Sequence, residues 1–205
     1  MRCRQHMSVK RHPYALLYHL AGHAVVMEHF DIPLISMRVH PRRRVGAVHG
    51  LGQRRDPAGS RLLVERDAIC AYAGGAAEDY GCGGSSWFST LEDSSSAAKR
   101  LLRFTHDPAE SSAWGSYLRE RACVMVREYW HEITVIAAVL QRERAMDRAS
   151  LGATLQAFRA NPFRAGLRPL RPVPWRRPHR SAGKDEVELV WSRPTLSELV
   201  ARMQR

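Results

Sequence analysis

The chain has 205 residues, 44% of them hydrophobic and 25% charged, which is enough for one globular core and a short appendage. Its net charge of +12 favours acidic partners such as nucleic acid, anionic lipid or acidic proteins. The four cysteines are widely spaced and form no C-x-x-C pair, which argues against a zinc ribbon or a dense disulfide framework and suits a reducing cytoplasm.

The sequence predicts no membrane helix, because no segment reaches the roughly 18 uninterrupted apolar residues that one needs. The basic N-terminus MRCRQHMSVKRHP lacks a following apolar region and a small-residue cleavage site, so a signal peptide is not expected. We therefore expect a soluble, cytoplasmic protein without a transmembrane segment.

The first half of the chain predicts two helices around a pair of strands. Residues 1–12 are a basic leader, and Pro13 suits the first turn of a helix that continues to about Phe30. LISMRVHP alternates like a strand, and RRRVGAVHGLG can return as a second, edge strand. A helix follows from about 60 to 80; its internal Gly74-Gly75 pair costs about 1 kcal/mol per glycine against alanine, so a close contact is expected there.

The second half predicts further helices and then a change of character. GCGGSSWFST is expected to be an ordered loop, and the predicted helices lie near 93–105, 116–144 and 150–159, with a loop at 106–114. Residues 161–205 form a Pro- and Arg-rich tail, irregular at first, that can hold a strand and a short helix at its end. The predicted fold class is mainly α (α+β), with one domain over residues 13–160.

Two histidines in LYHLAGHAVVMEHF carry the first functional signal. His19 and His23 are four residues apart, so on a helix their imidazoles share a face and can reach one metal ion. This spacing is common by chance, and the alternative is two histidines on an ordinary core helix. A zinc hydrolase site would add a carboxylate as third ligand. Asp93 is a candidate, although an aspartate at a helix start is also explained by the helix dipole.

Taken in order, these segments resemble the zinc peptidase domain of FtsH, the AAA-type membrane proteases. YHLAGHAVV resembles that family's Y-H-E-A-G-H-A-V/L-V, and ISMRVHPRRRVGAV resembles its pair of strands. AYAGGAAEDYG resembles its Y-L-G-G-R-A-A-E-E helix, and STLEDSSSAAKRLLRF resembles the stretch with its third metal ligand. The similarity covers about residues 13–158 and implies an FtsH peptidase-like helical domain with a small β-sheet.

The resemblance also implies a site. His19, His23 and Asp93 would bind one zinc ion per chain, and Glu78 would support a ligand histidine from behind. The edge strand around 45–48 would offer its backbone to an extended peptide substrate. The chain contains no Walker A sequence, so the peptidase module would act alone or with an ATPase partner, and family members form hexamers.

Leu20 departs from the family pattern, since it stands where the general-base glutamate of H-E-x-x-H belongs. General-base assistance is worth about 10²–10⁴ in rate, and leucine neither accepts nor donates a proton. Glu28 lies about 140° around the helix from His23, and HEITV at 131–135 lacks a second histidine. The expected protein is a metal-binding, FtsH-like domain with impaired or absent proteolysis, either a natural pseudoenzyme or an inactivated variant.

Three other interpretations stay open at the level of sequence. The domain could be an active zinc peptidase that uses another base, Glu92 being the nearest acid in sequence to Asp93. It could be a non-catalytic module that binds peptides or assembles with itself or a relative. The tail, with Arg171, Arg176, Arg177, Arg180 and Trp175, could bind an anionic partner, or it could be a solvated segment with scattered charge.

Overall fold

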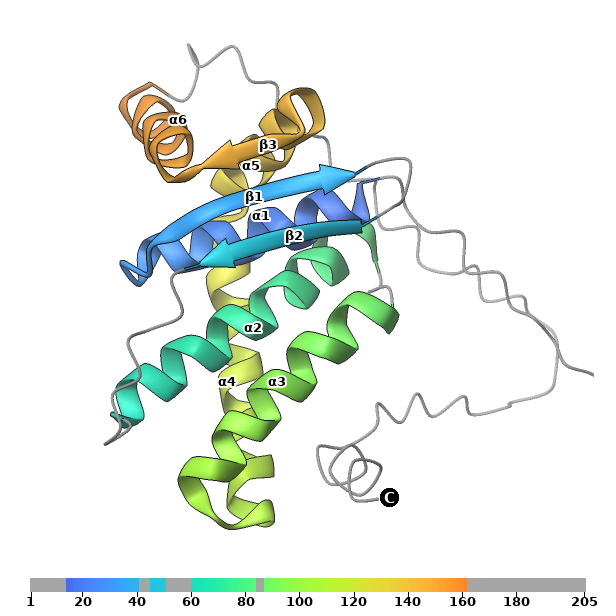
Figure 1. Ribbon diagram of the computed structural model, residues 1–205, viewed down its shortest axis with the longest axis vertical. Coiled ribbons are helices and arrows are strands. Elements are labelled where there is room, and N and C mark those ends of the chain that lie inside the picture. Colours follow the sequence, from blue (N-terminus) through green and yellow to red (C-terminus); the bar gives the residue numbers. More distant parts are fainter. Residues whose placement is uncertain (1–13, 41–44, 51–59, 84–86, 162–205) are drawn as a thin grey trace, which may run out of the picture.

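The computed structural model describes residues 14–40, 45–50, 60–83 and 87–161. The basic leader and nearly all of the Pro- and Arg-rich tail lie outside these ranges. The described elements are, in chain order, α1 (Ala15–His29), β1 (Leu34–His40), β2 (Val45–Gly50), α2 (Arg61–Cys82), α3 (Trp87–Thr105), α4 (Pro108–Glu128), α5 (Trp130–Glu143), β3 (Ala145–Asp147) and α6 (Arg148–Ala160). The protein is mainly helical with one small antiparallel sheet, as expected (Figure 1).

The three strands form a sheet in the order β2-β1-β3, with β1 antiparallel to both neighbours. Arg38 of β1 stands opposite Ala47 of β2 and Ala145 of β3. Within the described part of the chain, no strand pairs with the second edge of β2. The predicted edge strand is therefore confirmed, and β3 is an addition that the sequence did not predict.

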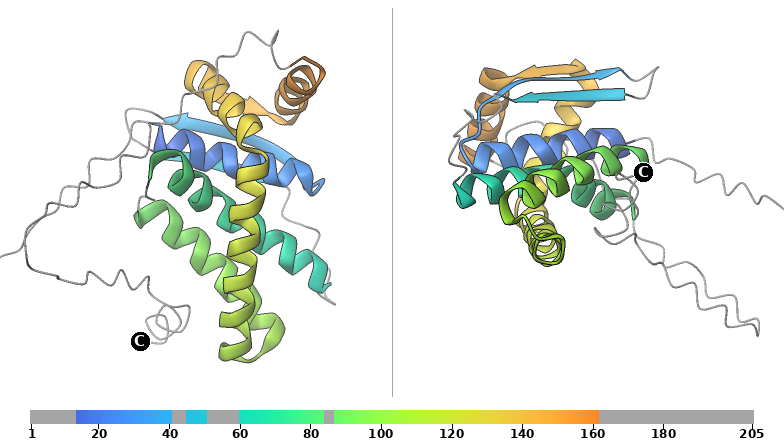
Figure 2. Two further views of the ribbon diagram at one scale, coloured as in Figure 1. Left: turned by 180° about the vertical axis from the view of Figure 1, so that it is seen from behind. Right: turned by 60° about the horizontal axis from the view of Figure 1, so that its bottom comes forward.

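Helix α1 lies at the centre of the fold. The sheet covers one side of it and α2 the other, while α5 packs alongside (Figure 2). α3 and α4 then pack against α2, and α6 packs against α5 and the sheet. A helix covered on several sides must be apolar around most of its circumference, and eleven of the fifteen residues of α1 are buried.

Small residues bring α1 and α2 close together. Gly22 of α1 faces α2, where a β-carbon added to it would lie 2.6 Å from the Ala77 side chain and 2.7 Å from the Ala73 carbonyl oxygen. Ala73 and Ala77 are themselves almost completely buried. The short side chains of AYAGGAAEDYG therefore allow this helix pair to approach closely, which puts α2 directly behind the face of α1 that carries the histidines.

Three predicted boundaries are wrong. α3 begins at Trp87 rather than near Asp93, so Asp93 lies in the second turn of the helix and is not at its start. The expected loop at 106–114 is short, because Asp107 caps α4 through its side chain and Pro108 opens the helix. The long helix predicted for 116–144 is broken at Tyr129 into α4 and α5.

No helix in the described ranges combines the length and the apolar character that crossing a bilayer requires. The largest apolar surfaces of these helices are instead covered by other elements of the same chain.

Candidate metal centre

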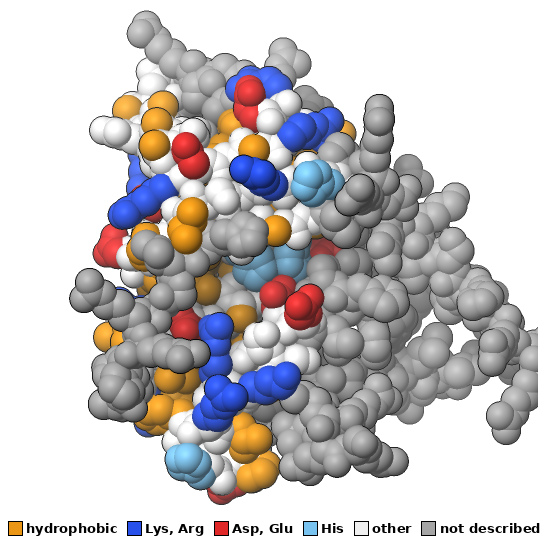
Figure 3. Space-filling view, in the orientation of Figure 1, with side chains coloured by type: hydrophobic (Ala, Val, Ile, Leu, Met, Phe, Trp, Pro, Cys, Tyr) orange, Lys and Arg blue, Asp and Glu red, His pale blue; other side chains and the backbone are white. Residues whose placement is uncertain are grey.

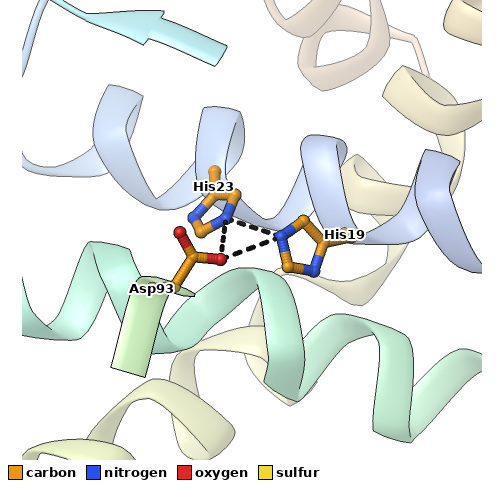
Figure 4. A group of neighbouring side chains, drawn as sticks. All are labelled: His19, His23 and Asp93. Carbon is orange, nitrogen blue, oxygen red and sulfur yellow. Dashed lines mark hydrogen bonds and ion pairs between the residues drawn. The ribbon is translucent and has the colours of Figure 1, made fainter. Parts of the chain in front are cut away.

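The two histidines and the aspartate singled out in the sequence meet at one point. Nε2 of His19 and Nε2 of His23 are 3.0 Å apart. Oδ2 of Asp93 lies 3.0 Å from the first and 3.3 Å from the second (Figure 4). The histidines come from successive turns of α1 and the aspartate from α3, so the site connects two helices that are far apart in sequence.

The spacing of these three atoms fits a small cation. Ligand atoms at 2.0–2.1 Å from a tetrahedral zinc ion are about 3.3 Å from one another. The three observed separations lie close to this value. Two imidazoles and one carboxylate are also the protein donor set of many catalytic zinc sites.

The remaining ring nitrogens fix the tautomers of the two histidines. Nδ1 of His23 is 2.7 Å from the backbone carbonyl oxygen of Cys70, which only accepts, so Nδ1 carries the proton. Nδ1 of His19 faces the carboxylate of Glu78 at 3.4 Å, too long for a strong hydrogen bond but close enough to favour a proton on that nitrogen. In the neutral rings both Nε2 atoms then lack a proton and lie 3.0 and 3.3 Å from Oδ2 of Asp93, and a cation is what three such acceptors accommodate.

Electrostatics at the site agree with this geometry. Burial disfavours the charged imidazolium of His19, but its contacts with Asp93 and Glu78 outweigh burial and raise its pKa to about 9. Burial also works against the charged form of Asp93, yet the two histidines hold the pKa of that carboxyl well below its usual range. Without a metal ion, the proton on His19 balances the negative charge of Asp93 and Glu78. A metal ion bound at the site would displace this proton.

The site is reached from the Asp93 side. The His19 and His23 side chains are only 6% and 12% exposed, whereas that of Asp93 is 31% exposed. Histidine side chains show near the middle of the face in Figure 3, below the sheet, with acidic side chains beside them. Among the described residues, His19, His23 and Asp93 are the group whose ligand atoms lie close enough to hold one metal ion.

Leu20 is buried between α1 and the edge strand. A β-carbon added to Gly46 of β2 would lie 2.5 Å from Cδ1 of Leu20 and 3.2 Å from Cδ1 of Leu16. Leu20 is 3% exposed, so its side chain fills the space next to His19 on the β2 side. A hydrocarbon side chain thus occupies the position of the base in the H-E-x-x-H pattern.

The other acids considered from the sequence do not take that position. Glu78 lies on the Nδ1 side of His19, away from the point where the Nε2 atoms meet. Glu92 is exposed and is the chain neighbour of Asp93, so on α3 it points about 100° away from the site. Glu132 of HEITV pairs with His29 and Arg159 at a different place in the fold.

One feature of the site was missed at the level of sequence, and another was predicted without its partner. The Cys70 contribution is a backbone carbonyl, which the residue type does not reveal. Gly74 lies against the His23 ring, where an added β-carbon would overlap the imidazole. The glycine pair inside a helix was the available signal, and the expected close contact there is confirmed.

Comparison with known proteins adds no identification. No model of a known protein family matches the chain, and no curated protein matches it either. The resemblance to the FtsH peptidase domain therefore enters below as part of a proposal.

Proposed function

We propose that this domain binds one zinc ion through His19, His23 and Asp93, in the manner of an FtsH-type peptidase, and that Leu20 suppresses hydrolysis. The observation that carries the proposal is the proximity of two Nε2 atoms and one carboxylate oxygen, which lie 3.0 to 3.3 Å from one another. Nδ1 of His23 is held from behind by the Cys70 carbonyl, and Nδ1 of His19 faces the Glu78 carboxylate at 3.4 Å, both on α2. This support is what fixes the orientation of metal-binding imidazoles in proteins.

The chemistry that remains follows from the residues present. A bound zinc ion would polarise a peptide carbonyl and supply positive charge. Hydrolysis also needs a group that takes a proton from the attacking water and gives it to the leaving amine. Leu20 cannot do this, and the nearby acids face elsewhere. The proposed activity is therefore slow or absent.

The same arrangement supports a peptide-binding role. β2 has one edge that no described strand occupies, and Gly46 places this strand directly over Leu16 and Leu20 of α1. An extended peptide could add to such an edge through main-chain hydrogen bonds, beside the metal point. A cleft that binds peptides without cutting them would serve a binding or assembly module, including a homo-oligomer or a complex with an ATPase.

Restoring the base tests the proposal. With zinc present, Leu20→Glu should hydrolyse an unfolded casein-like substrate about 10²–10⁴ times faster than the natural chain. Leu20→Gln is the matched control, because it has nearly the same size but no proton acceptor of that strength. Measurable zinc-dependent hydrolysis at the same rate in all three proteins would mean that another base acts. No detectable hydrolysis by Leu20→Glu would mean that the site is not arranged for hydrolysis and would leave the binding role.

A second candidate function rests on where the positive charge lies. The described ranges contain 13 of the 32 Lys+Arg but 15 of the 20 Asp+Glu residues, so the excess of positive charge lies in the rest of the chain. Residues 162–180 include six arginines and no acid. We propose that the tail after residue 161 binds single-stranded nucleic acid, with Trp175 as the residue that stacks on a base. In the full chain, replacing Arg171, Arg176, Arg177 and Arg180 by Ala should weaken binding and flatten its salt dependence. Unchanged binding would remove this candidate.

A further inference from the structure

One face of α2 contacts both histidines of the candidate metal centre. Cys70, Gly74 and Glu78 are spaced by four residues, so they follow one another along this face. The Cys70 carbonyl accepts a hydrogen bond from Nδ1 of His23 at 2.7 Å, and the Glu78 carboxylate lies 3.4 Å from Nδ1 of His19. Gly74 stands between them in sequence, and its nearest neighbour is the His23 ring around Nε2, so all three positions act on the histidine pair.

Gly74 makes its contribution by having no side chain. A β-carbon built on Gly74 would lie 2.7 Å from Cε1 and 2.8 Å from Cδ2 of His23, and closer still to its Nε2. Real β-carbons do not approach other atoms this closely, so any side chain at position 74 must displace the imidazole. The ring is the end of a side chain and can rotate, whereas the α2 backbone is fixed by its packing on α1 and α4.

Helix stability does not explain the glycine. In the interior of a helix, glycine is one of the least favourable residues, and alanine is the most favourable. Gly74 is buried and sits in the middle of the 22-residue helix α2, far from either end, where a glycine could serve as a cap. The requirement that excludes alanine is therefore the position of the His23 ring.

We propose that Gly74 is a positioning residue for the metal centre: it leaves the space that lets the Cys70 carbonyl turn Nε2 of His23 toward Nε2 of His19 and Oδ2 of Asp93. The inference rests on the proposed zinc site. It follows that metal binding and fold stability should respond differently to a substitution at position 74. Replacing Gly74 should disturb metal binding without destabilising the fold, because the displaced group is a histidine ring and the new residue favours the helix.

Two other glycines provide matched controls. Gly81 lies in the same helix, and a β-carbon there would come within 2.7 Å of the Trp130 and Tyr18 rings. These buried aromatic rings cannot yield as easily, so Gly81→Ala should lower the melting temperature. Gly152 of α6 has open space around it, with nothing within 4 Å of an added β-carbon, so Gly152→Ala controls for the substitution itself.

The experiment is a titration of the full chain and the three alanine variants with Co²⁺, read from its visible absorption bands, together with the melting temperature of each metal-free protein. Gly74→Ala should bind Co²⁺ about 10–100-fold more weakly than the natural chain, with a melting temperature that is unchanged or higher. Gly81→Ala should melt at a lower temperature and bind Co²⁺ as the natural chain does. Equal Co²⁺ affinity of Gly74→Ala and the natural chain would overturn the inference.

A second measurement tests the role of Gly74 independently of the proposed zinc binding. Nitrogen-15 NMR of the histidine rings in the metal-free proteins shows which ring nitrogen carries the proton. His23 of the natural chain should carry it on Nδ1, hydrogen-bonded to the Cys70 carbonyl, and Gly74→Ala should lose this signature. If the natural chain takes up no Co²⁺, the zinc proposal fails, and an unchanged His23 spectrum in Gly74→Ala would then overturn the role of Gly74 as well.

Discussion

At the scale of single residues, the proposed function depends on one side chain, Leu20. Leu20 differs from the family pattern by the loss of a carboxylate, yet it is not a loosely placed substitute. Its Cδ1 lies against Gly46, where even a methyl group would collide with it. Leu20 therefore packs the metal-bearing helix onto the edge strand, and a glutamate at this position would exchange that packing for a proton acceptor.

A second residue-scale interaction involves Glu132. Its carboxylate accepts hydrogen bonds from Nε and a terminal nitrogen of Arg159 at 2.8 and 3.0 Å, and it lies 3.1 Å from Nε2 of His29. His29 in turn stacks on Tyr129 with ring centroids 3.5 Å apart. One carboxylate thus joins the end of α1, the start of α5 and the last turn of α6.

This network predicts a dependence of stability on pH. Burial alone would raise the pKa of Glu132, but Arg159 and His29 outweigh burial and lower it from its ordinary value of 4.5. A carboxyl group whose pKa is lower in the folded state stabilises the fold above its unfolded pKa. That contribution is lost as the pH falls through the folded value. Glu132→Gln should therefore cost about 1 kcal/mol at pH 7, a modest figure because Arg159 is nearly half exposed.

Urea unfolding of the natural chain and Glu132→Gln at pH 7 and pH 3 measures this effect. The two proteins should differ clearly at pH 7 and approach each other as the pH falls, because the natural carboxyl becomes protonated once the pH drops below its lowered pKa. A difference of the same size at both pH values would show that the Glu132 charge does not stabilise the fold.

At the scale of elements, helices and strands were predicted most accurately where the hydrophobic pattern agreed with the residues that end such elements. α1 lies between Pro13 and Pro33, and its apolar circumference indicated a buried helix. β1 alternates, and α2 and α6 were predicted within a few residues of their observed limits. Local signals were sufficient in these cases because tertiary packing demanded the same structure.

The bounds of other elements depend on tertiary contacts that the local sequence does not reveal. The break between α4 and α5 carries no proline or glycine; it falls at Tyr129, which stacks on His29 of α1, and the two helices pack on different neighbours. β3 has three residues and one buried side chain, Met146, too little for a strand pattern. α3 begins at Trp87, so Ser89 and Thr90, which are weak helix formers alone, lie in its first turn.

At the scale of the whole molecule, acidic and basic residues are distributed unevenly along the chain. The described ranges carry slightly more acidic than basic residues, and the net charge of +12 comes from the segments outside them. A metal centre inside the fold and an anion-binding function outside it would then act through different parts of the chain. Mutations in one should leave the other unchanged.

The candidate site was partly predictable for the same reason as the helices. A spacing of four residues and a family-like order of segments found His19, His23 and Asp93, three residues that the fold brings within contact distance. The Cys70 carbonyl could not be found in this way, because a backbone oxygen leaves no trace in residue type. The Gly74-Gly75 pair indicated a close contact, but it did not indicate that the His23 ring makes it.

Metal content of the purified protein, measured by elemental analysis beside a His23→Ala variant, tests the central claim most directly. The account predicts about one zinc ion per natural chain and a loss of zinc in the variant, because three protein ligands would be reduced to two. No zinc in either protein, or the same amount in both, would contradict the proposed site and leave His19 and His23 as members of a hydrogen-bonded core pair.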